Sequence, residues 1–239
     1  MIVVLEGVDG SGKDTQARLL QERLLVNGHR AQLLAFPRYG ETFFSREIAR
    51  YLNGEFGELM SIHPKLTAVL FAGDRHESRD LISRLNIEMD FVILDRYTPS
   101  NQAHHAAKLP LEDWPDFFAW VETLEYETLA VPRPDLVLFL DLDAAHAVKL
   151  IGRKPSRVYT ARKADIHEVD AGYQQRVYEA YKRLSLNPNW VSIRCLDNGK
   201  LRTANEIHEE VWGALENQRN LDCVTKPLGD ATREHRTQK

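Results

Sequence analysis

Short apolar runs alternate along the chain with longer segments in which apolar residues recur at helical spacing. The runs lie at residues 2–5, 31–36, 91–94, 136–140 and 190–195. Runs of this length, bounded by glycine, proline or polar residues, predict buried parallel strands. Because strands and helices alternate, the pattern predicts an α/β fold: a doubly wound parallel five-stranded sheet flanked by helices, with ligands at the carboxyl ends of the strands.

The helical segments follow from the same periodicity. The first begins near Lys13, and its apolar positions are Ala17, Leu20, Leu24 and Leu25. A helix at 64–85 has its apolar side at Leu66, Val69, Leu70 and Ala72. Further helices are predicted at 44–52, 144–151, 173–184 and 203–215, with one or two more before Leu129.

We expect one domain, residues 1–218. Within it, residues from about 152 to 168 are rich in arginine and lysine without a firm pattern, and we interpret them as a lid. Residues 219–239 are polar, and we expect a disordered tail there.

Composition limits the function classes. The 239 residues carry a net charge of -4, which argues against broad binding to nucleic acid or membranes. The apolar run at residues 2–5 is too short for a signal peptide or a membrane span, so we expect a cytoplasmic protein. Cys195 and Cys223 lack metal-binding spacing and suit the core or the surface better than a disulfide or a zinc site.

A glycine-rich segment links the first strand to the first helix. Its spacing, G-x-x-x-x-G-K from Gly7 to Lys13, is typical of a P-loop NTPase-type phosphate loop. Backbone N–H groups of such a loop and the helix N-terminus bind phosphate, while the lysine reaches the β- and γ-phosphates. The predicted nucleotide-binding residues are Gly7, Val8, Asp9, Gly10, Ser11, Gly12, Lys13, Asp14 and Thr15.

Two alternatives to a phosphate loop exist. The segment could be an ordinary glycine turn, but such a turn does not require a strand before it and a helix after it, and both are predicted here. A dinucleotide-binding G-x-G-x-x-G fits poorly, because Gly10 and Gly12 lack the third glycine.

The metal ligands of this loop are left open by one substitution. A Ser or Thr that binds Mg²⁺ usually follows the lysine, but this chain has Asp14 and then Thr15. A strand-ending acid, Asp95, is a further candidate, although it could simply cap the next turn. The candidate Mg²⁺ ligands are Asp9, Thr15, Asp95 and Glu168.

Two further clusters carry candidate chemistry. Phe71 and Arg75 share a helix face. The Phe71 ring is available for stacking, and the Arg75 guanidinium can bind a phosphate or the edge of a base. The alternative for Phe71 is a place in the core. The basic cluster contains Arg153, Lys154, Arg157, Arg162 and Lys163. It is either a solvated surface or a set of mobile cations that close over phosphates and exclude water.

Four motifs together resemble the thymidylate kinase family. They are LEGVDGSGKDTQ, FPRYG, FAGDR and LDRYTPSNQAHH, in that family's order and spacing, and the resemblance spans most of residues 1–215. Actinobacterial-type members are the most similar, through residues 36–40, Ser100, Asn101, and Glu168 ahead of residues 174–176. The resemblance implies transfer of the γ-phosphoryl group of MgATP to dTMP, giving dTDP, by a homodimer packed through helices.

The resemblance also implies residue roles. Lys13 and the loop would hold ATP, and Asp9 would hold the acceptor region and the metal. Arg96 and Arg38 would bind the acceptor phosphate. The implied acceptor-binding set is Phe36, Arg38, Tyr39, Phe71, Arg75, Arg96, Ser100, Asn101, His104 and His167. The implied catalytic set is Lys13, Asp9, Arg96 and the lid residues Arg153, Arg157 and Arg162.

Three departures from the family pattern qualify these roles. His104 stands where relatives often have a tyrosine that crowds the sugar 2′ position, so the deoxyribose preference is expected to be looser. His167 replaces a lid tyrosine, and Asp14 replaces the common serine. The alternative functions are another nucleoside or nucleoside-monophosphate kinase and a non-catalytic nucleotide-binding module.

Overall fold

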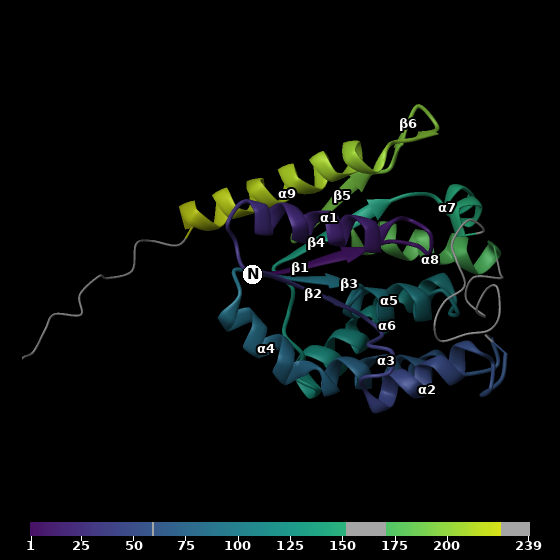
Figure 1. The fold of residues 1–239 in the computed structure, drawn as a ribbon. Helices are drawn as coiled ribbons and strands as arrows, with labels where there is room; N and C mark the ends of the chain where they lie inside the picture. Colours follow the sequence, from purple (N-terminus) through teal and green to yellow (C-terminus); the bar gives the residue numbers. More distant parts are fainter. Residues whose placement is uncertain (59, 152–170, 226–239) are drawn as a thin grey trace, which may run out of the picture.

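A five-stranded sheet forms the centre of the computed structural model, which describes residues 1–58, 60–151 and 171–225 (Figure 1). The strands are β1 (Ile2–Glu6), β2 (Ala31–Ala35), β3 (Phe91–Asp95), β4 (Leu136–Asp141) and β5 (Trp190–Arg194). Their order is β2-β3-β1-β4-β5, and all four pairings are parallel. The predicted fold class is therefore confirmed.

Strand β1 lies at the centre because both of its faces are apolar. Its side chains alternate between the two faces of the sheet. Val3 and Leu5 belong to the cluster that includes Leu20 of helix α1, whereas Ile2 and Val4 pack with Ile82 on the opposite face. All five β1 residues are buried, including the terminal Glu6.

Helices cover both faces of the sheet. They are α1 (Lys13–Val26), α2 (Phe43–Leu52), α3 (Pro64–Glu77), α4 (Arg79–Glu88), α5 (Thr98–Ala106), α6 (Trp114–Glu122), α7 (Ala144–Ile151), α8 (Ala171–Leu184) and α9 (Ala204–Thr225). In Figure 1, α1 and α9 lie together on one side, and α2 to α6 lie on the other. Helix α5 packs against α3, α6 and α8, so it brings several segments to the carboxyl ends of the strands.

The single helix expected at 64–85 is wrong, because α3 and α4 are separated at Ser78. The Ser78 hydroxyl donates to the carbonyl of Asp74, and its backbone N–H bonds to Arg75, one residue short of the α-helical partner. The expected apolar side of α3 is wrong at two positions, because Leu66 and Val69 are exposed. Ala72 is buried and Leu70 partly buried, as expected, and Thr67 and Ala68 complete the buried side. Leu25 of α1 is likewise exposed.

The carboxyl-terminal region differs from the prediction in two ways. Helix α9 continues to Thr225, so residues 219–225 of the expected disordered tail are helical; residues 226–239 lie outside the described part. A short antiparallel hairpin, β6 (Leu196–Asp197) with β7 (Lys200–Leu201), was not predicted. The expected lid also lies outside the described residues.

The segment before β4 contains irregular helical turns. A short 3-10 helix, η1 (Leu111–Asp113), precedes α6, and a π-helix, η2 (Thr123–Thr128), follows it. Trp114 and Phe117 of α6 are buried, and Phe118 and Trp120 pack partly buried against the same core. Cys195 is buried with a free thiol, as expected for a core residue. No helix in the part of the chain that the structure describes is long and apolar enough to cross a membrane.

Candidate nucleotide site

The glycine-rich segment forms a compact turn between β1 and α1. Gly7, Gly10 and Gly12 all have positive φ, at 150°, 87° and 93°, which side chains other than glycine rarely adopt. A Cβ atom on Gly7 would lie 2.7 Å from the Ser11 Oγ and 3.0 Å from the carbonyl oxygen of Leu140. The loop is thus fitted closely against β4, and α1 begins directly after it at Lys13.

The side chain of Lys13 folds back over its own loop. Its Nζ donates to the carbonyl oxygens of Gly7 and Val8, both at 2.9 Å. The side chain is buried, and burial together with the nearby charge of Arg96 lowers the pKa of Lys13 to about 7, against the opposing effect of Asp9. Lys13 therefore occupies a position from which a phosphate would compete with two carbonyl oxygens.

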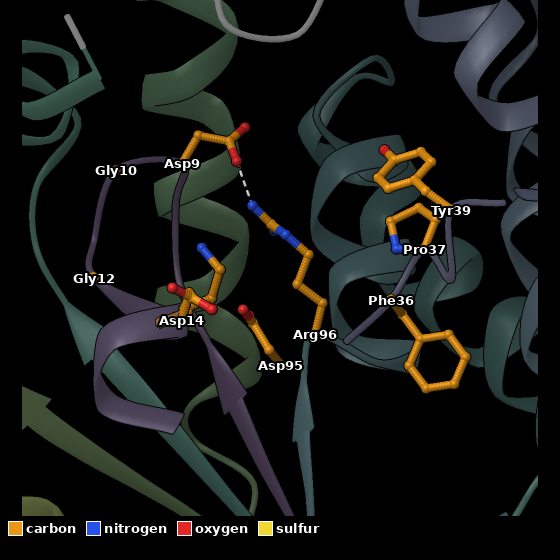
Figure 2. Close-up of a pocket in the computed structure, with 10 residues that line it drawn as sticks. Asp9, Gly10, Gly12, Asp14, Phe36, Pro37, Tyr39, Asp95 and Arg96 are labelled. Carbon is orange, nitrogen blue, oxygen red and sulfur yellow. Dashed lines mark hydrogen bonds and ion pairs between the residues drawn. The ribbon is translucent and has the colours of Figure 1, made fainter. Parts of the chain in front are cut away.

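A cavity of about 240 Å³ opens beside the loop, where β1, β2 and β3 end (Figure 2). Its lining residues are Asp9, Gly10, Gly12, Lys13, Asp14, Phe36, Pro37, Tyr39, Asp95 and Arg96. The predicted phosphate loop, the FPRYG segment and the D-R-Y segment thus meet in one place. Figure 2 shows the guanidinium of Arg96 reaching across the cavity to Asp9.

Arg96 is held by several partners at the mouth of this cavity. It forms an ion pair with Asp9, and its Nη1 lies 3.3 Å from both the Ser100 Oγ and the His104 Nε2. Its backbone has a φ of 68°, unusual for a residue with a side chain. Burial alone would lower the pKa of Arg96, but the charge of Asp9 raises it above its ordinary value, so the guanidinium stays charged.

Glu6, which the sequence analysis did not identify as a site residue, binds the segment that follows Arg96. It is fully buried and accepts hydrogen bonds from the backbone N–H groups of Tyr97, at 2.8 Å, and Ser100, at 3.1 Å. The hydroxyls of Ser100 and Tyr181 also donate to it. Burial raises the pKa of Glu6, against the effect of the Ser100 hydrogen bond. The first turn of α5 is therefore capped by a carboxylate from β1.

The imidazole of His104 is fixed in one tautomer. Arg96 can only donate, so the His104 Nε2 must accept and the proton lies on Nδ1. The Tyr173 hydroxyl donates to the His104 carbonyl oxygen at 2.8 Å and lies 3.4 Å from Nδ1. Burial lowers the pKa of His104 to about 3, so the ring is neutral near pH 7.

A second cluster lies between α3, α5 and η2. Arg75 and Asn101, both predicted to read the acceptor, bind Glu125, which the sequence analysis missed. Phe71 is half-buried and contacts the rings of Tyr51, at 6.2 Å between centroids, and His105, at 5.2 Å. The structure therefore places Phe71 and Arg75 on α3 beside Asn101 on the neighbouring α5, and their role as a base site stays a prediction.

Several predicted residues do not converge on the cavity. Arg38 binds Glu41 and the Ser78 hydroxyl at the end of α3, and its backbone N–H donates to Asp74, so its guanidinium is held by these groups and does not line the cavity. Thr15 is exposed and does not line the cavity, whereas Asp14 lines it and also pairs with Arg18 at 2.8 Å. Arg153, Arg157, Arg162, His167 and Glu168 lie outside the described residues.

The acidic residues at the cavity suit a phosphate-bound Mg²⁺. The described residues contain no group of three His, Cys, Asp or Glu side chains able to hold a metal by themselves. Mg²⁺ commonly keeps several waters and takes one or two carboxylates plus substrate phosphates. Asp9 and Asp95, from the loop and from the end of β3, are hard oxygen donors on the same cavity and fit that mode of binding.

Fold and site together define a P-loop nucleotide-binding protein. The thymidylate kinase family model matches residues 5–207. A thymidylate kinase of Mycobacterium tuberculosis is 37% identical over 185 residues, which are 77% of this chain and 86% of the relative. The human thymidylate kinase is 31% identical over 234 residues, 96% and 95% of the two chains. The chain belongs to the thymidylate kinase family.

A solved structure agrees at the level of the fold. The thymidylate kinase of Candida albicans superposes with a TM-score of 0.71 over 92% of each chain, at 23% sequence identity.

Proposed function

We propose that the protein is an ATP-dependent thymidylate kinase that transfers the γ-phosphoryl group of ATP to dTMP. In this reaction a phosphate oxygen of dTMP attacks the γ-phosphorus, the bond to the β,γ-bridging oxygen breaks, and ADP leaves with dTDP formed. The observation that supports the proposal is that the glycine-rich loop and Arg96 line one cavity, where the loop would bind the donor and Arg96 would bind the acceptor phosphate.

On the donor side, Lys13 and the loop N–H groups would hold the β- and γ-phosphates. Lys13 would exchange the Gly7 and Val8 carbonyl oxygens for phosphate oxygens, so its ammonium nitrogen would change partners with little movement of the side chain. Mg²⁺, when bound, supplies charge neutralisation of the phosphates, with Asp9 and Asp95 as proposed ligands and Thr15 and Glu168 as further candidates. Arg153, Arg157 and Arg162 remain the proposed lid cations, with His167 close to them in sequence.

On the acceptor side, Arg96 would bind the phosphate of dTMP. Its ion pair with Asp9 and its contacts to Ser100 and His104 keep the guanidinium at the cavity before the acceptor arrives, which lowers the entropy cost of binding. Arg38 would join it after leaving Glu41. Phe36 and Tyr39 line the cavity and would form its acceptor wall.

The acceptor base would lie against Phe71, with Arg75 and Asn101 at its polar edge. Phe71 is half-buried rather than enclosed by the core, which leaves part of its ring available for stacking. His104 would adjoin the sugar as a neutral ring smaller than a tyrosine, which supports a looser preference for deoxyribose.

Three properties of the whole protein belong to the same proposal. We propose a cytoplasmic homodimer and a closest relationship to actinobacterial-type members. The exposed Leu66 and Val69 of α3 support an interface between two copies of the chain, because exposed apolar side chains on one helix are commonly covered by a partner.

The decisive experiment is ADP release with MgATP against dTMP, dUMP, UMP, CMP, dGMP and thymidine. Preference for dTMP supports the proposal. Preference for another acceptor would point to a different nucleoside or nucleoside-monophosphate kinase. Tight ATP binding without turnover of any acceptor would point to a non-catalytic nucleotide-binding module.

A further inference from the structure

Glu125 is the shared partner of the two proposed base readers. Its side chain is 0% exposed, and it lies in η2, on the turn that continues the buried side of α6. Oε1 accepts from the Asn101 Nδ2 at 2.7 Å and from the Arg75 Nη2 at 2.6 Å. Oε2 accepts from the Arg75 Nε and from the Thr98 hydroxyl. One carboxylate thus holds side chains from α3 and α5 together.

These contacts determine which way the Asn101 amide points. Its Nδ2 lies between two acceptors, Glu125 and the carbonyl oxygen of Ala68, the latter at 3.0 Å. A carboxylate and a carbonyl cannot donate, so the amide cannot flip without placing oxygen against oxygen. The Oδ1 atom of Asn101 therefore points the other way, where it has no hydrogen-bond partner among the described residues although the side chain is 2% exposed.

Arg75 is fixed in a corresponding way. Two of its three nitrogens, Nε and Nη2, are used by Glu125, and the guanidinium is buried. Nη1 remains as the nitrogen that Glu125 does not use. An unpartnered buried acceptor on Asn101 is costly in a folded protein unless a ligand satisfies it.

We propose that Glu125 is a positioning residue that sets base selectivity, by holding Asn101 to present an acceptor and Arg75 to present a donor. A thymine or uracil ring carries an N3–H donor next to a 4-carbonyl acceptor, which matches this pair. Cytosine carries an N3 acceptor next to a 4-amino donor, which opposes both groups. This inference rests on the proposed function, because it assumes that the base lies at these two side chains.

Glu125→Gln tests the role with little change in volume. A glutamine has one acceptor oxygen where the carboxylate has two, so Arg75 loses one of its two contacts in either orientation of the amide, and Asn101 loses its contact when the amide nitrogen replaces Oε1. We expect the ratio of kcat/KM for dTMP to kcat/KM for dCMP to fall about tenfold or more, mainly through KM for dTMP. A parallel fall for both acceptors, with an unchanged ratio, would show that Glu125 only supports the fold and would overturn the proposal.

Thr98→Val is the matched control. It removes a hydrogen bond to the same carboxylate while leaving the Asn101 and Arg75 contacts in place, so the selectivity ratio should stay within about twofold of wild type. The double variant N101A/E125Q adds a second test. If Glu125 acts through Asn101, E125Q should change the ratio much less in the N101A background than in wild type.

A measurement on the wild-type chain keeps the proposal testable if the E125Q variant does not fold. The 5′-monophosphate of N3-methylthymidine cannot donate from N3, and we expect it to compete with dTMP at least tenfold more weakly than dUMP does. Equal competition would overturn the orientation assigned to Asn101. Wild-type protein that turns over none of dTMP, dUMP and dCMP would instead refute the proposed function, and this inference with it.

Discussion

At the scale of single residues, the most informative side chain is Lys13, which binds its own loop. Lys13→Ala should remove a phosphate-binding charge and should abolish turnover, while the loop keeps its shape through the glycine backbone. Steady-state rates with MgATP and dTMP measure the loss, and far-ultraviolet circular dichroism checks the fold. A near-normal rate in Lys13→Ala would remove the loop from the proposed mechanism.

The lowered pKa of Lys13 predicts proton uptake on nucleotide binding. With a pKa of about 7, Lys13 is mostly neutral at pH 8 in the free protein, and a bound phosphate raises its pKa so that it takes up a proton. Calorimetry with a non-hydrolysable ATP analogue, in two buffers of different ionisation enthalpy, should show uptake at pH 8. Lys13→Arg is already charged and should show none; equal uptake by this variant would assign the proton to another group.

His104 predicts the sugar preference. Its ring is neutral and fixed between Arg96 and Tyr173, and it fills less space than a tyrosine. We expect kcat/KM for UMP to approach that for dUMP, and His104→Tyr to restore preference for dUMP. A wild-type efficiency with UMP far below that with dUMP would show that other groups exclude the 2′-hydroxyl.

At the scale of elements, α5 depends on a cap supplied by another element. Glu6→Ala would leave two buried N–H groups of the α5 first turn without an acceptor, and should destabilise the fold by about 3 kcal/mol. Urea unfolding measures this loss in the free energy of unfolding. Glu6→Gln retains an acceptor and should lower the free energy of unfolding less. Glu88→Ala, on the exposed side of α4, should leave it nearly unchanged. Equal stability of Glu6→Ala and Glu88→Ala would contradict the capping role.

Periodicity located most elements but not their interruptions. It found the helices of residues 64–85 because apolar residues recur there, yet Ser78 separates α3 from α4 through hydrogen bonds that leave no apolar signature. It also assigned Leu66 and Val69 to the core, whereas α3 turns its small and polar side inward, toward α5. One sequence signal for Glu125 was present: it follows the buried Trp114, Phe117 and Val121 at helical spacing, and an acid on an apolar side indicates a buried partner.

At the scale of the whole molecule, the sequence predicted the sheet and the residues that line the cavity better than the buried acids that hold the site residues in position. The sequence motifs that contain the phosphate loop, Asp95 and Arg96 lie directly after predicted strands. In a parallel sheet the carboxyl ends of the strands lie at one edge, so these motifs come together there. Glu6 and Glu125 act on partners distant in the chain, at Ser100 and Arg75, and no local pattern encodes such pairs.

The proposed dimer is testable at this scale. Sedimentation equilibrium should give the mass of two chains, and Leu66→Asp together with Val69→Asp should shift it toward one chain, because charge would enter the interface. Ile87→Asp on α4, where the exposed apolar side chain lies on a different helix, should not shift the mass. A wild-type monomer at micromolar concentration would contradict the dimer.

The position of β1 also has a consequence for synthesis of the chain on the ribosome. Its neighbours β3 and β4 are made far later: Ile2 pairs with Val92, and Val3 with Leu136. Until β4 has emerged, β1 has an unpaired edge and the loop lacks the Leu140 carbonyl against which Gly7 fits. Nascent chains that stop before residue 136 therefore expose an apolar strand, and they need a chaperone or rapid completion to avoid aggregation.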